Sequence, residues 1–421
     1  MKRAHQFVLS LATLASWCSP WAISTALAEQ RPTPADLPST AQARQGIEQD
    51  PSVAEARDAL VAAGHGAAAL RAGSYEWTTR LSAQRRRYDG GGNSSEWAAA
   101  LERAVRIGGK AEIDTALGDS DMAIGRARLA EARHTAARAL ADMWLDLQAT
   151  RRQRELWADQ LNFAQASQQA VEKRHKAGDA SMLDLNAANA DLIDVQRQSS
   201  AAATAEAKSQ ARLAVRFPGL PHDALPLTEP AALDMGLAQW RARILEQSDA
   251  IKVAEGWLKK AELGAARTKA DRIPDPTVGI YTASEAFRRE RIVGLSVSIP
   301  LSGSYRSERM HQALQEAEAA RATVERLKRD EEVSIVDTFA DATGGLERWR
   351  LTAQGLSKTR DSARLTQRAY ALGETDLQTL LLARRQALEA STAAEQARVD
   401  ALRAHYRLLV DAHLIWGMEE D

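Results

Sequence analysis

The chain has 421 residues, of which 55 are Lys or Arg, 56 are Asp or Glu and one is Cys. Charges of both signs are interspersed, which excludes the clustered basic face that nucleic-acid binding needs. A single cysteine excludes a disulfide framework within the chain and a Cys-based zinc site. Ala, Arg, Glu, Gln and Leu dominate long stretches that contain little Gly or Pro, a composition typical of long helices and coiled coils.

Residues 1–28 have the pattern of a secretory signal peptide. A basic start precedes a short apolar stretch, and Ala26-Leu27-Ala28 supplies the small-x-small cleavage pattern, so the mature chain is expected to begin at Glu29. The apolar stretch is shorter than the about 20 residues of a membrane-spanning helix. Cys18 lies inside this segment and follows Trp17 rather than a small residue, so we expect no lipidation.

Residues 29–216 form the first of two structural units that the sequence predicts. Three prolines in Arg31–Pro38 predict an extended, poorly ordered arm. A helical stretch from Asp50 to Arg71 follows. Tyr75–Tyr88 alternates with period 2, which indicates a strand, and a Gly-rich loop leads to a second alternating run. A β-hairpin is therefore predicted at about 75–107.

The remainder of this unit, about 110–216, is predicted to be a pair of long helices. Lys110–Lys176 contains no proline and has only Gly118 and Gly125 as interior helix breakers. About 60 helical residues extend roughly 90 Å. A helix of that length must pack lengthwise on its neighbours, as in a coiled coil or a helical tube.

A second unit at 241–416 repeats the first. Four prolines within 217–240 forbid a continuous helix and mark a linker. A helix, a hairpin at about 276–301, and a long helix pair at about 305–416 follow, with Gly344-Gly345 as an expected local weakening; 417–421 is a C-terminal tail. In both units a single Gly followed by an acid separates the long helices, 195 residues apart.

The two hairpins have one apolar and one polar face, which leaves two interpretations. They are either ordinary hairpins that pack on soluble helices, or strands of a lipid-facing, water-lined wall. No later hydrophobic run is long enough for a transmembrane helix, so any membrane crossing must be made by strands. Four strands cannot close a barrel, whose smallest membrane forms have about eight. Three copies would pool twelve.

Catalytic and metal-binding patterns are missing from the sequence. It contains no G-x-S-x-G, Walker A, Rossmann glycine or HExxH pattern, so we expect no enzyme activity, no cofactor and no metal site. No two histidines pair at i, i+4. His405 and His413 are eight residues apart on one helical face and could meet, although surface or packing roles are the favoured interpretation.

Several short segments carry a resemblance to a known family. They are Pro274-Asp275-Pro276-Thr277 before a strand, Val297-Ser298-Ile299-Pro300-Leu301 before a long helix, and the two Gly-acid turns. Their order and duplication resemble the TolC-type outer-membrane efflux family over essentially the whole mature chain. The resemblance implies a mainly α fold with a small β part: a homotrimer with a twelve-stranded barrel in the outer-membrane lipid and a long α-helical barrel in the periplasm.

The resemblance also assigns roles to the two helical turns. In the family these tips form the periplasmic entrance and contact a periplasmic adaptor, which links the duct to an inner-membrane transporter. The tip residues that match are Gly178, Asp179, Ser181, Gly373, Glu374 and Asp376.

Some relatives narrow the entrance with rings of aspartate. The positions here look like Thr379 and Leu382, which are not acidic, whereas Asp184 is retained and Asp376 could form a ring nearby. Acids beside such turns are equally well explained as solvated groups at helix N-termini.

Ile107-Gly108-Gly109-Lys110 resembles the heavy-metal cation branch of the family, the CzcC-like ducts, with Ala111 where a second basic residue is frequent. The expected function is the outer-membrane duct of a tripartite efflux system, RND-type and exporting divalent heavy-metal cations. The alternatives are a duct for drug efflux or type I secretion, and a soluble periplasmic coiled-coil adaptor.

Overall fold

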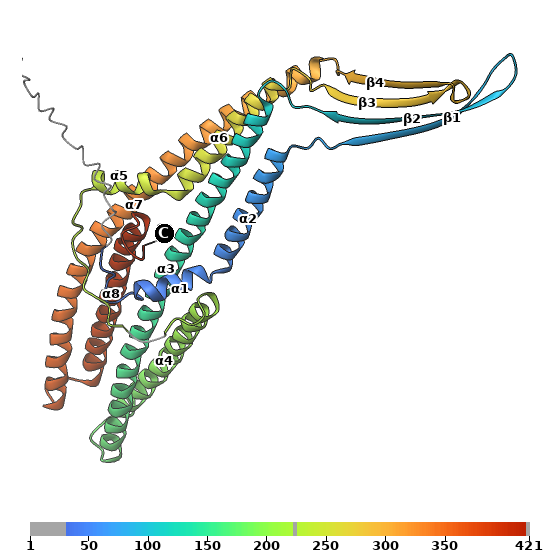
Figure 1. Cartoon of the computed structure of the whole chain (residues 1–421). Helices are drawn as coiled ribbons and strands as arrows, with labels where there is room; N and C mark the ends of the chain where they lie inside the picture. Colours follow the sequence, from blue (N-terminus) through green and yellow to red (C-terminus); the bar gives the residue numbers. More distant parts are fainter. Residues whose placement is uncertain (1–30, 222–224, 418–421) are drawn as a thin grey trace, which may run out of the picture.

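The computed structural model describes residues 31–221 and 225–417; the expected signal peptide lies outside this part of the chain. Figure 1 shows long helices that run side by side and a sheet that extends from one end of them. The helices are α1 (Thr40–Glu48), α2 (Pro51–Ala72), α3 (Lys110–Lys176), α4 (Met182–Arg216), α5 (Leu237–Gln247), α6 (Asp249–Ala270), α7 (Ser304–Ala371) and α8 (Leu377–Asp411). The strands are β1 (Thr78–Arg87), β2 (Asn93–Ala104), β3 (Thr277–Glu285) and β4 (Glu290–Ser298).

The two longest helices set the dimensions of the molecule. α3 has 67 residues and α7 has 68, which corresponds to about 100 Å each. α3 packs on α2 and α4, α7 packs on α6 and α8, and α3 also contacts α6 and α8. Each long helix is therefore covered lengthwise by shorter helices, as its length requires. None of the described helices combines the length and hydropathy needed to cross a bilayer.

Glycines within the long helices serve close packing. A Cβ on Gly118 would lie 2.9 Å from the Cα of Ala67 in α2, and one on Gly345 would lie 3.1 Å from the Cα of Ala401 in α8. Both helices continue through these positions, so α7 is not interrupted at Gly344-Gly345. The absence of a side chain lets two helix backbones approach closely, and this packing outweighs the low helix propensity of glycine.

The largest core surrounds the middle of α3 and is here called the girdle: residues 31–48 with α1, residues 225–247 with α5, and residues 412–417 after α8. Trp144, Trp240 and Trp416 are fully buried in it. Asp36 is buried as well, and it accepts hydrogen bonds from the Tyr406 hydroxyl (2.6 Å) and from the backbone and hydroxyl of Thr228 (both 2.9 Å).

The prediction of a poorly ordered arm at Arg31–Pro38 is wrong, because this segment is bound to the rest of the girdle. The Arg31 N–H donates to the Leu414 carbonyl (2.8 Å), and Leu37 is buried in the core. The Trp416 indole donates to the Pro38 carbonyl (3.1 Å). Proline residues lack a backbone N–H donor, but the carbonyls and side chains of this segment still form contacts with the other segments of the girdle.

The strands form one antiparallel sheet in the order β1-β2-β3-β4, so β1 and β4 are its edges. The hairpins occupy the two regions where alternation predicts them. β3 extends to Glu285, and a short 3-10 turn (Ala286–Arg288) joins it to β4. α5 begins at Leu237, inside the segment 217–240 in which the prolines predicted no continuous helix.

Candidate functional site

One face of the sheet is apolar and exposed. Leu81, Val293 and Leu295 are 76%, 84% and 81% exposed. Leu101 pairs with Ile280, which pairs with Leu295, so apolar side chains align across three strands. No described helix covers this face, which argues against hairpins packed on the chain's own helices. A continuous exposed apolar surface marks contact with lipid or with another protein.

The opposite face carries paired charges. Arg80 lies 3.6 Å from Glu102, and Arg86 lies 3.2 Å from Glu96 and 3.5 Å from Glu285. Both arginines are on β1, Glu96 and Glu102 are on the adjacent strand β2, and Glu285 is on β3, so the charges are paired across three strands. The sheet thus separates a polar, hydrogen-bonded surface from an apolar one.

A buried ion pair fixes the sheet to the helices. The Lys110 side chain, 1% exposed, donates to Oδ1 of Asp275 and to the Ile273 carbonyl, both at 2.7 Å. Asp275 also accepts from the Ile107 N–H (3.1 Å) and the Tyr75 hydroxyl (2.7 Å). Burial acts to raise the pKa of Asp275, but Lys110 and the other donors hold it below its ordinary value. Two segments that carry the family resemblance therefore meet at this junction.

The two helical tips are built alike. Gly178 and Gly373 have φ of 80° and 78°. Asp179 N–H donates to the Arg174 carbonyl and Gly178 N–H to the His175 carbonyl; Glu374 and Gly373 make the equivalent bonds. These are Schellman motifs, in which the residue after the C-cap takes a left-handed conformation that favours glycine.

The acids next to the tips cap the following helices. The Ser181 hydroxyl accepts from the Asp184 N–H (3.1 Å), and the Asp184 carboxylate accepts from the Ser181 N–H (3.1 Å), which makes a capping box. The Asp376 carboxylate accepts from the Thr379 N–H (2.7 Å), and this bond lowers the pKa of Asp376. Both aspartates thus have a structural role in the chain, whatever they do at an entrance.

The two tips contact each other. The Arg174 guanidinium donates to the Tyr370 hydroxyl (3.1 Å) and also pairs with Asp179 (2.9 Å). Val171, Ala188, Leu377 and Leu380 form a small core between the two helix pairs. The predicted tip and gate residues therefore share one end of the molecule, although the side chains of Thr379 and Leu382 point to solvent.

Sequence reasoning missed a second feature of this end. Met182, Leu183 and Leu372 are large apolar side chains that lie exposed beside the tip glycines, as does Leu382. Apolar residues directly after a helix N-cap are an available signal, but their exposure depends on how the two tips pack. Together they give the tips an apolar surface suited to contact with protein.

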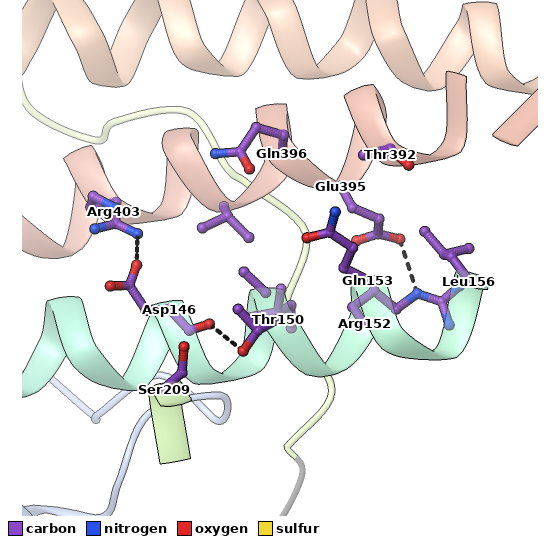
Figure 2. Close-up of a pocket in the computed structure, with 13 residues that line it drawn as sticks. Asp146, Thr150, Arg152, Gln153, Leu156, Ser209, Thr392, Glu395, Gln396 and Arg403 are labelled. Atoms are coloured by element: carbon purple, nitrogen blue, oxygen red, sulfur yellow. Dashed lines mark hydrogen bonds and ion pairs between the residues drawn. The ribbon is translucent and has the colours of Figure 1, made fainter. Parts of the chain in front are cut away.

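A hollow of about 240 Å³ lies between α3, α4 and α8 (Figure 2). Two ion pairs join α3 to α8 there: Asp146 with Arg403 at 2.6 Å and Arg152 with Glu395 at 3.4 Å. These charges neutralise one another across the hollow. We interpret the hollow as a gap in helix packing that these pairs bridge.

The histidines pair differently from the expectation. His413 lies against His134 of α3, with ring centroids 5.2 Å apart, whereas His405 lies against Tyr406. Burial lowers the pKa of His413 to about 4. His405 and His413 do not meet because the chain reverses at His413, which has a φ of 53°.

Solved structures share this architecture. The chain superposes on the outer-membrane channel OprN with a TM-score of 0.77 and 20% identity, over 90% of each chain. VceC, an outer membrane protein from Vibrio cholerae, gives 0.72 at 17% identity, with 88% of this chain and 95% of that one covered. CusC, which forms a transmembrane channel, gives 0.74 at 15% identity, with 88% and 91% covered. The fold is that of the TolC-type outer-membrane channels.

No protein-family model and no curated protein matches the sequence. The likeness is therefore a likeness of fold. At that level the resemblance and the mainly α, partly β class are confirmed, and the TolC-type fold places the apolar sheet and the helical tips at opposite ends of the molecule (Figure 1).

Proposed function

We propose that the protein is the outer-membrane channel subunit of a tripartite efflux system, and that it is not an enzyme. The observation that carries the proposal is the sheet: four strands with one exposed apolar face, one ion-paired polar face and two open edges, β1 and β4. Open edges in lipid leave backbone groups unpaired at a cost of several kcal/mol each. Three copies that join β4 to β1 of the next copy would give a closed, twelve-stranded barrel.

The remaining parts of the chain take their roles from this arrangement. The helices, of about 100 Å, would extend the water-filled path into the periplasm as a trimeric helical barrel. The twofold occurrence of helix, hairpin and long helix pair supports an internal repeat, with units at 29–216 and 241–416. The path is passive, since an inner-membrane transporter would supply the energy.

The tips are proposed to bind the periplasmic adaptor and to form the entrance. Gly178, Asp179, Ser181, Gly373, Glu374 and Asp376 would contact the adaptor, together with the exposed apolar residues beside them. Asp184 and Asp376 would line the entrance, with Thr379 about one turn and Leu382 about two turns further along α8.

For the cargo, we propose divalent heavy-metal cations and an RND-type pump. The support is the Ile107-Gly108-Gly109-Lys110 junction, in which Lys110 is the buried partner of Asp275. Drug efflux and type I secretion are the other outcomes. Deleting the gene and measuring growth on zinc, cobalt or cadmium salts against growth on hydrophobic drugs separates them.

The channel assignment is tested by fractionating expressing cells and sizing the detergent-extracted protein before and after heating. We expect recovery in the outer membrane as a species three times the heated mass. Recovery from the soluble periplasm as a monomer would overturn the proposal and favour the coiled-coil adaptor. Cysteine cross-linking from Leu372 to a co-expressed adaptor tests the tips, with exposed Leu351, on α7 away from the tip, as the matched control.

A further inference from the structure

Two histidines and a carboxylate meet beside the girdle, away from both the sheet and the tips. They are His134 of α3, Asp249 at the start of α6 and His413 just after α8. One possible ligand atom from each lies within 4.8 Å of the others. The three residues are 4%, 3% and 5% exposed, and they come from three segments that are distant in sequence.

The backbone at His413 is unusual. The Leu414 N–H donates to the Leu409 carbonyl (2.8 Å) and the His413 N–H to the Val410 carbonyl (3.0 Å). This is the same Schellman motif that ends α3 and α7, where Gly178 and Gly373 hold the left-handed position. At the end of α8 a histidine holds it, with a φ of 53°. The chain thus carries an imidazole at a position where glycine is favoured, and this reversal places it against His134.

The imidazole of His413 has an unpartnered nitrogen. Its Nε2 is buried and has no hydrogen-bond partner among the described residues. The nearest acid oxygen is Oδ2 of Asp249 at 3.6 Å, which is beyond hydrogen-bond range. The other oxygen of Asp249 accepts from Lys252 (3.1 Å), so Oδ2 faces His413. Buried polar atoms normally have partners, and this one points at a carboxylate and a second imidazole.

A carboxylate holds one ring nitrogen of His134. Its Nε2 lies 3.2 Å from Oδ1 of Asp411, which the Arg138 guanidinium also binds at 2.6 Å. When the Nε2–H donates to this carboxylate, Nδ1 keeps a free lone pair. A carboxylate that holds the second nitrogen of a histidine is the usual support of a metal-bound imidazole, because it fixes the ring and raises its basicity.

We propose that His134, His413 and Asp249 bind one divalent transition-metal ion of the Zn²⁺ class within each chain. Two imidazoles and one carboxylate suit Zn²⁺, Ni²⁺ or Cu²⁺, whereas Ca²⁺ and Mg²⁺ require oxygen ligands. With bonds of about 2.0 Å, ligand atoms around a tetrahedral ion lie about 3.3 Å apart. The three ligand atoms lie within 4.8 Å of one another, so binding would require side-chain rotations that close this spacing, and water would supply a fourth ligand.

The bound ion would join α3, the start of α6 and the end of α8. It is a resident ion, because its ligands are buried in the chain. The site is argued from these residues alone and does not depend on the cargo or on the channel assignment.

The test uses the full mature chain, purified without a histidine tag in detergent and stripped with a chelator. Zn²⁺ is titrated by calorimetry, and Co²⁺ is added to record the visible absorption of a tetrahedral site. The variants are His413→Gly, which suits the local backbone, and His134→Gln. His405→Gln removes a half-buried histidine outside the cluster and is the matched control.

We expect one Zn²⁺ per chain, a tetrahedral Co²⁺ spectrum and a metal-dependent rise in Tm of about 3 °C or more at saturation. Both cluster variants should lose the spectrum and bind at least 100-fold more weakly, while His405→Gln keeps wild-type binding. Without metal, the Tm of His413→Gly serves as the check that it folds. An absence of binding by the wild type, or binding unchanged in both cluster variants, would overturn the proposal.

Discussion

Replacing Lys110 with Met tests whether the buried ion pair holds the sheet on the helices. Met keeps most of the volume of the Lys stem, so the change removes mainly the charge and two hydrogen bonds of 2.7 Å. Removing one partner of a buried pair costs about 3–5 kcal/mol. Asp275 keeps its bonds from Tyr75 and Ile107, so we expect the lower end, about 3 kcal/mol.

The assay is denaturant unfolding in detergent, followed by far-UV circular dichroism. Arg326→Met is the matched control, since Arg326 pairs with Asp330 on an exposed face of α7 at 2.7 Å and such a pair contributes less than about 1 kcal/mol. The double variant Lys110→Met with Asp275→Asn should cost less than the sum of its parts by about 1–3 kcal/mol. Equal losses for Lys110→Met and Arg326→Met, or strict additivity, would refute the reasoning.

This pair also has a pH signature. A carboxyl whose folded pKa is lowered stabilises the fold above its unfolded pKa of about 4, and that contribution is lost as the pH falls through the folded pKa. Lys110 makes the largest contribution that lowers the pKa of Asp275. In Lys110→Met the folded pKa of Asp275 should move back toward or above the unfolded value, so the acid-induced loss of stability that comes from Asp275 should be smaller than in the wild type.

Three further outcomes are expected. Leu295→Arg on the apolar face should cost about 2–4 kcal/mol in a bilayer and reduce recovery of the protein in the membrane fraction. Ser296→Arg on the other face should not reduce it, and similar recovery of the two variants would contradict a lipid-facing wall. Gly373→Ala should destabilise by about 1 kcal/mol because φ is 78°, while Gly355→Ala in mid-α7 should be neutral or stabilising, as thermal unfolding will show. Asp411→Asn should flatten the fall in Tm between pH 7 and pH 3, since His134 and Arg138 outweigh burial and hold the pKa of Asp411 low; an unchanged slope would contradict this.

Local patterns predicted the parts of the fold that local chemistry determines. The start of α3 at Lys110 and its end at Lys176 follow from flanking glycines, and period 2 located both hairpins. The tip glycines were found because a tight reversal requires a left-handed residue. In each case the signal lies within a few residues of the feature.

Contacts between distant segments could not be predicted in this way. His413 was compared with His405 because they share a helix period, but the reversal after α8 turns it toward His134. Asp36 and Lys110 are polar residues whose burial depends on partners far along the chain. Helical periodicity predicts which face of a helix is buried but not the register in which two helices pack, so these contacts could not be predicted from the sequence.

The girdle imposes an order on folding. The hydrogen bond from the Trp416 indole to the Pro38 carbonyl joins residues 378 apart, and the Arg31 N–H donates to the Leu414 carbonyl. The first described segment binds Trp144 and Thr228 earlier in the chain, but its contacts with Leu414 and Trp416 can form only when nearly the whole chain has been synthesised. α3 and α4 can form a local hairpin early, whereas the contacts that join the N-terminal segment to the C-terminal residues have a long sequence separation and form slowly. A chain that ended before Leu414 would keep its helices but would lack the hydrogen bonds that join residues 31–38 to residues 414–416.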